Sequence, residues 1–141
     1  MRVIPGQCHC GNITYEFTWP TDEEKLPARA CSCSFCVKHG GVYTSHPAGR
    51  LDITLAEPKC VRRYRFGQKS ADFMICTECG VIVVAVSKID GKDYAVVNVN
   101  TFETLGPGDM ERAVTNFDGE NRSTRLARRQ RNWTGDVRIR P

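Results

Sequence analysis

Cys31-Ser-Cys-Ser-Phe-Cys36 places three thiols within six residues, in a C-x-C-x2-C pattern. Cysteines that serve only as small buried hydrophobic residues tend to be scattered along a chain, so this density indicates a metal site. Three thiolates leave one position open on a tetrahedral metal such as zinc. The identity of the fourth ligand therefore becomes the main question that the sequence poses.

Two further cysteine pairs have the form of zinc knuckles, which are short turns that present two sulfurs on one side of a loop. Cys8-His-Cys10 and Cys76-Thr-Glu-Cys79 are each followed by glycine and stand just before a predicted strand. Two knuckles brought together supply the four sulfurs of a structural zinc site. We therefore predict two zinc sites, one on Cys8, Cys10, Cys76 and Cys79 and the other on Cys31, Cys33 and Cys36.

The second site leaves alternatives open. Cys60 could be its fourth ligand and make both zincs structural, although no knuckle or neighbouring glycine surrounds this residue. The histidines are also possible ligands, namely His9, His39 and His46. A redox-active Cys33–Cys36 pair is a rival interpretation, but such motifs usually begin a helix in a βαβ unit, and the sequence predicts none here.

The composition is typical of a globular protein, and 141 residues fit one zinc-binding domain over residues 1–141. No apolar run approaches the length of a membrane span, and the first residues lack the apolar stretch of a signal peptide. We therefore expect a cytoplasmic protein that has no membrane partner and keeps its thiols reduced.

Alternating apolar and polar residues, the pattern of half-buried strands, dominate the chain. The segment 19–27 has a polar, proline-flanked composition and is predicted to be a loop, and only residues from about 119 to 131 have helical character. The expected fold is mainly β, mostly antiparallel, with a short C-terminal helical segment. Strands are predicted at residues 13–18, 42–45, 51–55, 61–66, 71–75, 81–86 and 94–99.

An open zinc site made of three thiolates can bind an incoming thiol, lower its pKa and hold it as a nucleophile. The reaction that matches this property is attack of a substrate sulfur on a small electrophile such as a carbonyl. We assign Cys31, Cys33 and Cys36 to this catalytic role. Lys38 and Arg63, together with Arg62 and Arg65, could bind the carboxylates of an acidic thiol, and no Asp or Glu stands out as a general base.

Three cysteine motifs resemble those of the glutathione-dependent formaldehyde-activating enzyme family, also called the centromere protein V family. The motifs are Gly6-Gln-Cys-His-Cys-Gly11, Cys31-Ser-Cys-Ser-Phe-Cys-Val-Lys38 with Gly40-Gly41, and Cys76-Thr-Glu-Cys-Gly80. Asn116-Phe-Asp-Gly119 and Asn132-Trp-Thr-Gly135 are similar to the family as well.

The resemblance implies a β-tent fold of small antiparallel sheets with a structural and a catalytic zinc. It also implies that the catalytic zinc takes the thiol of glutathione, which adds to formaldehyde to give S-hydroxymethylglutathione. Written in reverse, this is a carbon–sulfur lyase reaction. The expected partners are therefore a small thiol such as glutathione and a small aldehyde.

A second hypothesis is a non-catalytic zinc module that binds nucleic acid or protein through its Arg-rich C-terminal segment. The net charge is +4, and the excess lies in the last fifth of the chain. The arginines there are Arg122, Arg125, Arg128, Arg129, Arg131, Arg138 and Arg140. The segment also contains Leu126 and Trp133, which indicates that it docks on the fold. We favour the enzyme and do not expect nucleic acid as a partner.

Overall fold

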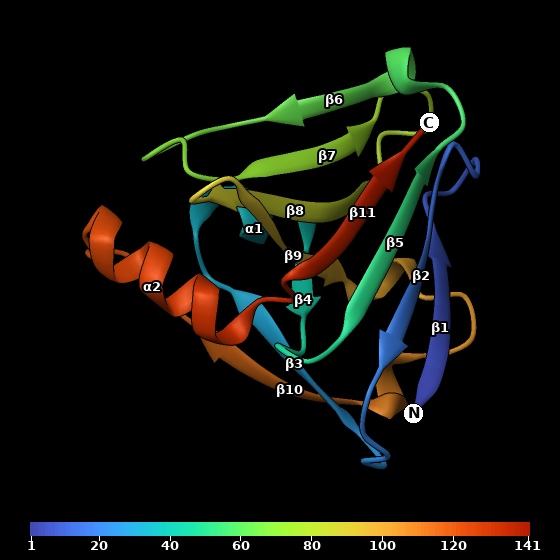
Figure 1. Cartoon of the computed structure of the whole chain (residues 1–141), viewed down its shortest axis with the longest axis horizontal. Coiled ribbons are helices and arrows are strands. Elements are labelled where there is room, and N and C mark those ends of the chain that lie inside the picture. The colour runs from blue at the N-terminus through green and yellow to red at the C-terminus, as the bar shows by residue number, and fades with distance from the viewer.

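The computed structural model describes residues 1–141 and contains two β-sheets and two α-helices (Figure 1). The four-stranded sheet has the order β1-β2-β5-β11, with β1 Arg2–Gln7, β2 Ile13–Trp19, β5 Arg50–Leu55 and β11 Asp136–Arg140. The seven-stranded sheet has the order β10-β3-β4-β9-β8-β7-β6. Its strands are β3 Leu26–Cys31, β4 Val42–Thr44, β6 Val61–Tyr64, β7 Asp72–Cys76, β8 Ile82–Ile89, β9 Lys92–Asn98 and β10 Met110–Thr115.

The helices are α1, Ser34–His39, and α2, Arg122–Asn132, and three short 3-10 turns cover Pro58–Cys60, Val99–Thr101 and Pro107–Asp109. In Figure 1, α2 lies at one side of the molecule, next to the edge strand β10 and away from the four-stranded sheet. Neither helix is long and apolar enough to cross a membrane.

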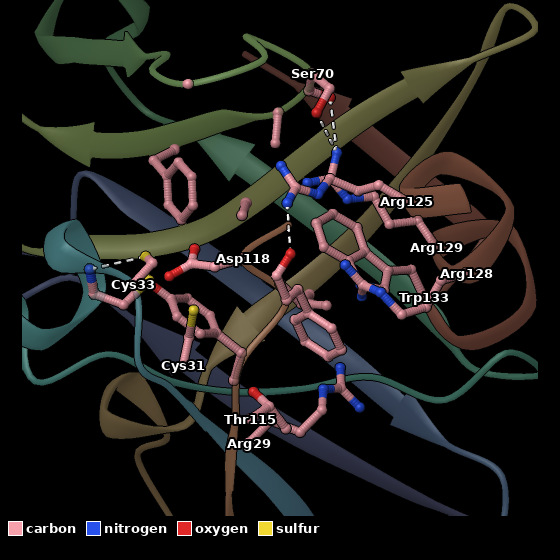
Figure 2. A pocket seen from close by; sticks show the side chains of 18 of the residues that line it. Arg29, Cys31, Cys33, Ser70, Thr115, Asp118, Arg125, Arg128, Arg129 and Trp133 are labelled. Atoms are coloured by element: carbon pink, nitrogen blue, oxygen red, sulfur yellow. Dashed lines mark hydrogen bonds between the residues drawn. The ribbon is translucent and has the colours of Figure 1, made fainter. Parts of the chain in front are cut away.

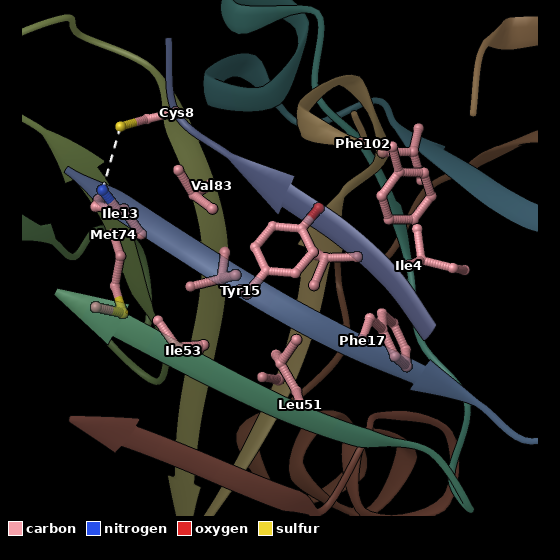
Figure 3. Close-up of a cluster of buried hydrophobic side chains, with 14 of the residues drawn as sticks. Ile4, Cys8, Ile13, Tyr15, Phe17, Leu51, Ile53, Met74, Val83 and Phe102 are labelled. Atoms are coloured by element: carbon pink, nitrogen blue, oxygen red, sulfur yellow. Dashed lines mark hydrogen bonds between the residues drawn. The ribbon is translucent and has the colours of Figure 1, made fainter. Parts of the chain in front are cut away.

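The core lies between the two sheets and follows from the alternation in the strands. Ile13, Tyr15 and Phe17 of β2 are buried, while the residues between them are more exposed. They pack against residues of both sheets, including Met74 and Val83 (Figure 3). The apolar run in β8 is buried along almost its whole length, as expected for a strand covered on both faces.

The mainly β fold with small sheets and a short C-terminal helix is confirmed, but several local predictions are wrong. The segment 19–27 is not a loop throughout, because β2 extends to Trp19 and β3 begins at Leu26. The edge strand β1 was missed because it contains Pro5 and Gly6. Proline is tolerated at a sheet edge, and Gly6 is required there because the Tyr15 ring lies against its Cα.

The helix α1 was also missed, since six residues give too short a pattern to recognise. The C-x-x-C pair does begin this helix, as in redox proteins, with Cys33 as its N-cap, but the strands that the helix connects, β3 and β4, are antiparallel. The motif therefore does not belong to a βαβ unit. The edge strands β10 and β11 were missed as well, and they pair in parallel with β3 and β5.

Candidate functional site

The two predicted knuckles come together at one end of the core. The sulfur atoms of Cys8, Cys10, Cys76 and Cys79 all lie within 4.8 Å of one another. The Sγ–Sγ distance is 3.8 Å between Cys8 and Cys10 and 3.5 Å between Cys10 and Cys76. A tetrahedron with zinc–sulfur bonds of about 2.3 Å has sulfurs about 3.8 Å apart. The geometry of this four-cysteine group therefore fits zinc.

The two knuckles have the same backbone construction. The N–H of Cys8 donates to the carbonyl of Ile13, and the N–H of Cys76 donates to the carbonyl of Val81, both at 3.0 Å. The glycine in each turn has a positive φ, +84° and +79°, which favours glycine. The Ile13 N–H donates back to Cys8 Sγ at 3.3 Å (Figure 3), which stabilises a thiolate there.

Two thiols of the four-cysteine group have pKa values shifted in opposite directions. Burial acts to raise the pKa of Cys79, but the backbone N–H groups of Cys10 and Val81 outweigh it and lower that pKa to about 6. The Asn12 N–H acts to lower the pKa of Cys10, yet hydrogen bonding to Cys76 and its neighbours raises it to about 12. The shifts favour a thiolate at Cys79, and zinc binding would release the proton that Cys10 retains.

The second cluster is built from the end of β3 and the start of α1. The sulfurs of Cys31, Cys33 and Cys36 also lie within 4.8 Å of one another. Cys33 is the N-cap of α1, and its Sγ accepts a hydrogen bond from the Cys36 N–H at 3.4 Å. The helix ends at Gly40, where φ is +63° and the conformation is left-handed. The short helix thus turns Cys36 back toward the strand that ends in Cys31.

The hydrogen bond between Cys31 and Cys36 shifts the pKa values of these two thiols in opposite directions. A hydrogen bond from Cys36 is the main reason that the pKa of Cys31 falls to about 5, in spite of partial burial. The same contact, together with burial, raises the pKa of Cys36. Cys36 Sγ is also 4.0 Å from the Tyr43 hydroxyl, and the Tyr43 ring lies against Gly41, where a Cβ would be 2.8 Å from Oη. Gly41 therefore allows Tyr43 to reach the cluster.

The three-cysteine cluster opens into a cavity of about 430 Å³, whereas no member of the four-cysteine group lines it. Apolar side chains form much of the wall, among them Tyr43, Phe66, Phe73, Ala85, Val96, Phe117 and Trp133. In Figure 2, Cys31 and Cys33 lie on one side of the cavity, and Arg125, Arg129 and Trp133 lie on the other. Asp118, which is exposed, lies on the side of the cysteines.

Four arginines contribute to this wall, and we call them the arginine wall: Arg29, Arg125, Arg128 and Arg129. Glu120 binds Arg125 at 3.3 Å and Arg128 at 3.0 Å. The Arg128 guanidinium stacks on the Phe117 ring with its Cζ 3.6 Å from the centroid. Figure 2 shows that three of these arginines come from one face of α2.

Most other predicted ligands and contacts lie away from this cavity. Cys60 belongs to neither sulfur group. Lys38 and Arg63 are not among the residues that line the cavity, and Arg63 is 3.7 Å from Asp72 in an ion pair. The assignment of Lys38 and Arg63 to substrate binding stays a prediction. The histidines also belong to neither sulfur group: His9, His39 and His46.

The C-terminal arginines do not form one surface. Arg125, Arg128 and Arg129 line the cavity, while Arg138 and Arg140 lie on β11 in the other sheet. A nucleic-acid surface needs basic side chains that follow the phosphate backbone together. The distribution of these arginines therefore gives no support to the nucleic-acid hypothesis.

Sequence reasoning missed several residues of the cavity. Arg29 lies two residues before the cluster, and Asp118 lies in the quoted Asn116–Gly119 motif, yet neither position was assigned a role. The pairing of β3 with β10 would have indicated both positions. β3 and β10 are parallel neighbours, with Cys31 opposite Thr115, so the segment after β10 necessarily passes the cysteine cluster.

Comparison with known proteins agrees with these cysteine positions. The model of the glutathione-dependent formaldehyde-activating enzyme family matches residues 3–117. The chain belongs to this family. The match includes all eight cysteines and ends before α2, so three members of the arginine wall lie outside it.

A crystal structure of a Rhodobacter sphaeroides protein is similar to this chain, with a TM-score of 0.59 and 27% sequence identity. The similarity covers 79% of this chain and 99% of that protein. No curated protein matched the chain.

Proposed function

We propose that this protein joins a small thiol, such as glutathione, to a small aldehyde, as a zinc-dependent enzyme of the carbon–sulfur lyase type. One observation carries the proposal: the three-cysteine cluster lines the cavity, and the four-cysteine group does not. Family membership supports the same activity, because the family is described as glutathione-dependent and formaldehyde-activating.

We assign the four-cysteine group to a structural zinc and the cluster of Cys31, Cys33 and Cys36 to a catalytic zinc. A zinc ion bound by the three thiolates would supply one further position for the substrate thiol and lower its pKa. Tyr43 contributes a hydroxyl beside Cys36. Burial is the main reason that the pKa of Tyr43 is raised, so this hydroxyl stays protonated and can donate a hydrogen bond to sulfur.

The reaction needs a route for one proton. As the carbon–sulfur bond forms, the carbonyl π electrons move to oxygen, and the proton lost by the thiol must end on that oxygen. Asp118, the only carboxylate among the lining residues, can accept the proton from the thiol and return it to the product hydroxyl. Thr115 lies opposite Cys31 in the sheet and also lines the cavity.

The test is kinetic and uses exchange NMR of the adduct between glutathione and formaldehyde. The zinc-loaded protein should accelerate adduct exchange, and Cys36→Ser should abolish the acceleration. Cys60→Ser is the matched control, because Cys60 is partly buried and belongs to neither sulfur group. If the wild-type protein accelerates exchange no more than buffer does, the assignment of glutathione and formaldehyde as substrates is wrong. If Cys36→Ser keeps full activity, the three-cysteine cluster is not the catalytic site.

A further inference from the structure

The arginine wall carries positive charge that the proposed thiol–aldehyde chemistry does not use. Arg125 and Arg128 share the carboxylate of Glu120. Arg29 and Arg129 form no ion pair at all. Among the four guanidinium groups the wall itself holds one carboxylate, that of Glu120, because Asp118 lies on the side of the cysteines. The wall therefore has an excess of positive charge.

Arg129 is the most unusual member of the wall, because its residue is only 9% exposed. Its Nη1 donates to the Ser70 carbonyl at 3.1 Å and to the hydroxyls of Ser70 and Ser87 at 2.8 and 3.1 Å. Its Nε is buried and has no partner. A buried cation without a counterion is costly, and a bound anion would offset that cost.

The pKa of Arg129 agrees with this description. Burial is the main cause that lowers the pKa to about 10, and repulsion from Arg128 and Arg125 adds to it. Three neutral side chains hold Arg129 in place. Ser70 and Ser87 accept its hydrogen bonds, and the Trp133 ring lies 4.8 Å from its Cζ. The guanidinium is therefore fixed in position before any ligand binds, and its charge remains uncompensated.

The floor of the cavity is apolar and runs between the cysteines and the arginine wall. Tyr43, Ala85, Val96 and Trp133 are buried beneath it. Phe66 and Phe73, with ring centroids 5.4 Å apart, add to the apolar lining. A peptide group that lay directly on these rings would have no hydrogen-bond partner in them, which costs free energy. The floor instead suits a hydrocarbon chain or an aromatic ring.

We propose that the substrate thiol is an apolar carboxylic acid, with its sulfur at the cysteine cluster, its hydrocarbon body on the apolar floor and its carboxylate at Arg129. The placement of the sulfur rests on the proposed function. The recognition of the hydrocarbon body and of the carboxylate does not follow from family membership alone. Two of the residues involved, Arg129 and Trp133, lie beyond the region that the family model matches. Nη1 of Arg129 already donates to Ser70 and Ser87 and its Nε is buried, so Nη2 is the group that can donate to the carboxylate, and the positive charge gives the site its selectivity for an acid.

Binding can be measured without the reaction by using a thiol-free probe. 3-Phenylpropanoate should bind to the zinc-loaded protein in calorimetry, at least tenfold more tightly than acetate or the uncharged 3-phenylpropan-1-ol. Lengthening an aliphatic acid should strengthen binding about fourfold for each methylene that is buried. Equal affinity for acetate would overturn the role of the apolar floor, and equal affinity for the alcohol would overturn the role of the arginines.

Two variants test the arginines. Arg129→Met should weaken binding of 3-phenylpropanoate by about tenfold to a hundredfold, as expected for loss of a charged hydrogen bond, and Arg129→Lys should weaken it less. Arg122→Met is the matched control, because Arg122 is an exposed residue on α2 outside the cavity. If Arg129→Met does not fold, Arg129→Gln gives the same test, since its amide can still donate to Ser70 and Ser87 but carries no charge. Unchanged affinity in a folded variant of this kind refutes the proposal.

The outcomes separate this inference from the proposed function. Tight, arginine-dependent binding of 3-phenylpropanoate without any acceleration of thiol–aldehyde exchange would overturn the proposed function and leave the anion site standing. Acceleration with glutathione, but no binding of 3-phenylpropanoate, would overturn the present inference and leave the proposed function standing.

Discussion

The two sulfur groups should differ in how much they stabilise the fold, and the pair Cys10→Ser and Cys33→Ser tests this. Each substitution removes one sulfur and leaves no large hole in the core, because Cys10 is exposed and Cys33 is only partly buried. Serine also retains the N-cap of α1 at position 33, where it is among the preferred residues. The stability difference between the variants therefore reports on the metal sites.

The expected size follows from the length of chain that each site closes. The four-cysteine group joins Cys10 to Cys76, 66 residues later, and the other cluster spans only Cys31 to Cys36. In the chain-entropy treatment of cross-links, the first closure stabilises by about 4 kcal/mol and the second by about 2 kcal/mol. For a chain of 141 residues, these values correspond to a fall in Tm of about 14 °C and about 7 °C.

The assay is thermal unfolding by circular dichroism in a reducing buffer, after dialysis and with zinc counted per chain. The wild type should hold two zinc ions, and each variant should hold one. Cys10→Ser should then melt at a clearly lower temperature than Cys33→Ser. An equal or larger loss of Tm in Cys33→Ser would refute the assignment of the four-cysteine group as the structural site, and so would an unchanged Tm in Cys10→Ser.

Two further predictions concern acidic residues near the cavity. Asp118→Asn should slow the proposed adduct exchange about a hundredfold without loss of zinc. Asp109→Asn is the control and should leave the exchange rate unchanged, because Asp109 lies outside the cavity. Equal exchange rates in Asp118→Asn and the wild type would exclude Asp118 as the proton carrier. The hydrogen bond from Arg128 is the main cause that holds the pKa of Glu120 below its usual value of 4.5. Its ionised form therefore stabilises the fold at neutral pH, and this contribution is lost as the pH falls below about 4.5. Urea unfolding of Glu120→Gln should accordingly show a loss of stability relative to wild type at pH 7 that disappears near pH 3, and a constant difference would contradict the pairing.

Strands were predictable from the sequence where apolar and polar residues alternate or where the strand is continuously apolar. Strands that form only because they pair with the edge of a sheet were not predictable. β2 and β8 follow from sequence because their side chains pack on the core. β10 and β11 carry exposed charges and pair in parallel at sheet edges. These two strands show little apolar–polar alternation, because backbone hydrogen bonds to one partner strand, and not packing of their side chains, hold them in place. The helix α1 depends on a cap and a left-handed glycine in the same way.

The cysteine groups were predictable for a different reason. A metal restricts both residue type and spacing, so C-x-C and C-x-x-C are visible before any fold is known. A carboxylate-binding arginine has no such spacing. Lys38 and Arg63 were chosen because they are near cysteines in sequence or lie on a basic strand, whereas Arg125 and Arg129 reach the cavity only through the docking of α2. Tertiary contacts, and not proximity along the chain, bring those arginines to the site.

This difference has a consequence for how activity and substrate are determined in this chain. The reacting group is local, because Cys31 to Cys36 need only the end of one strand and one short helix. The opposite wall comes from α2, which lies beyond the matched region of the family. Under the proposed function, substitutions on the cavity face of α2 are expected to change which thiol binds while the reaction at sulfur stays the same. We infer that the family match indicates the type of reaction, and that the side chains on the cavity face of α2 determine which substrate binds.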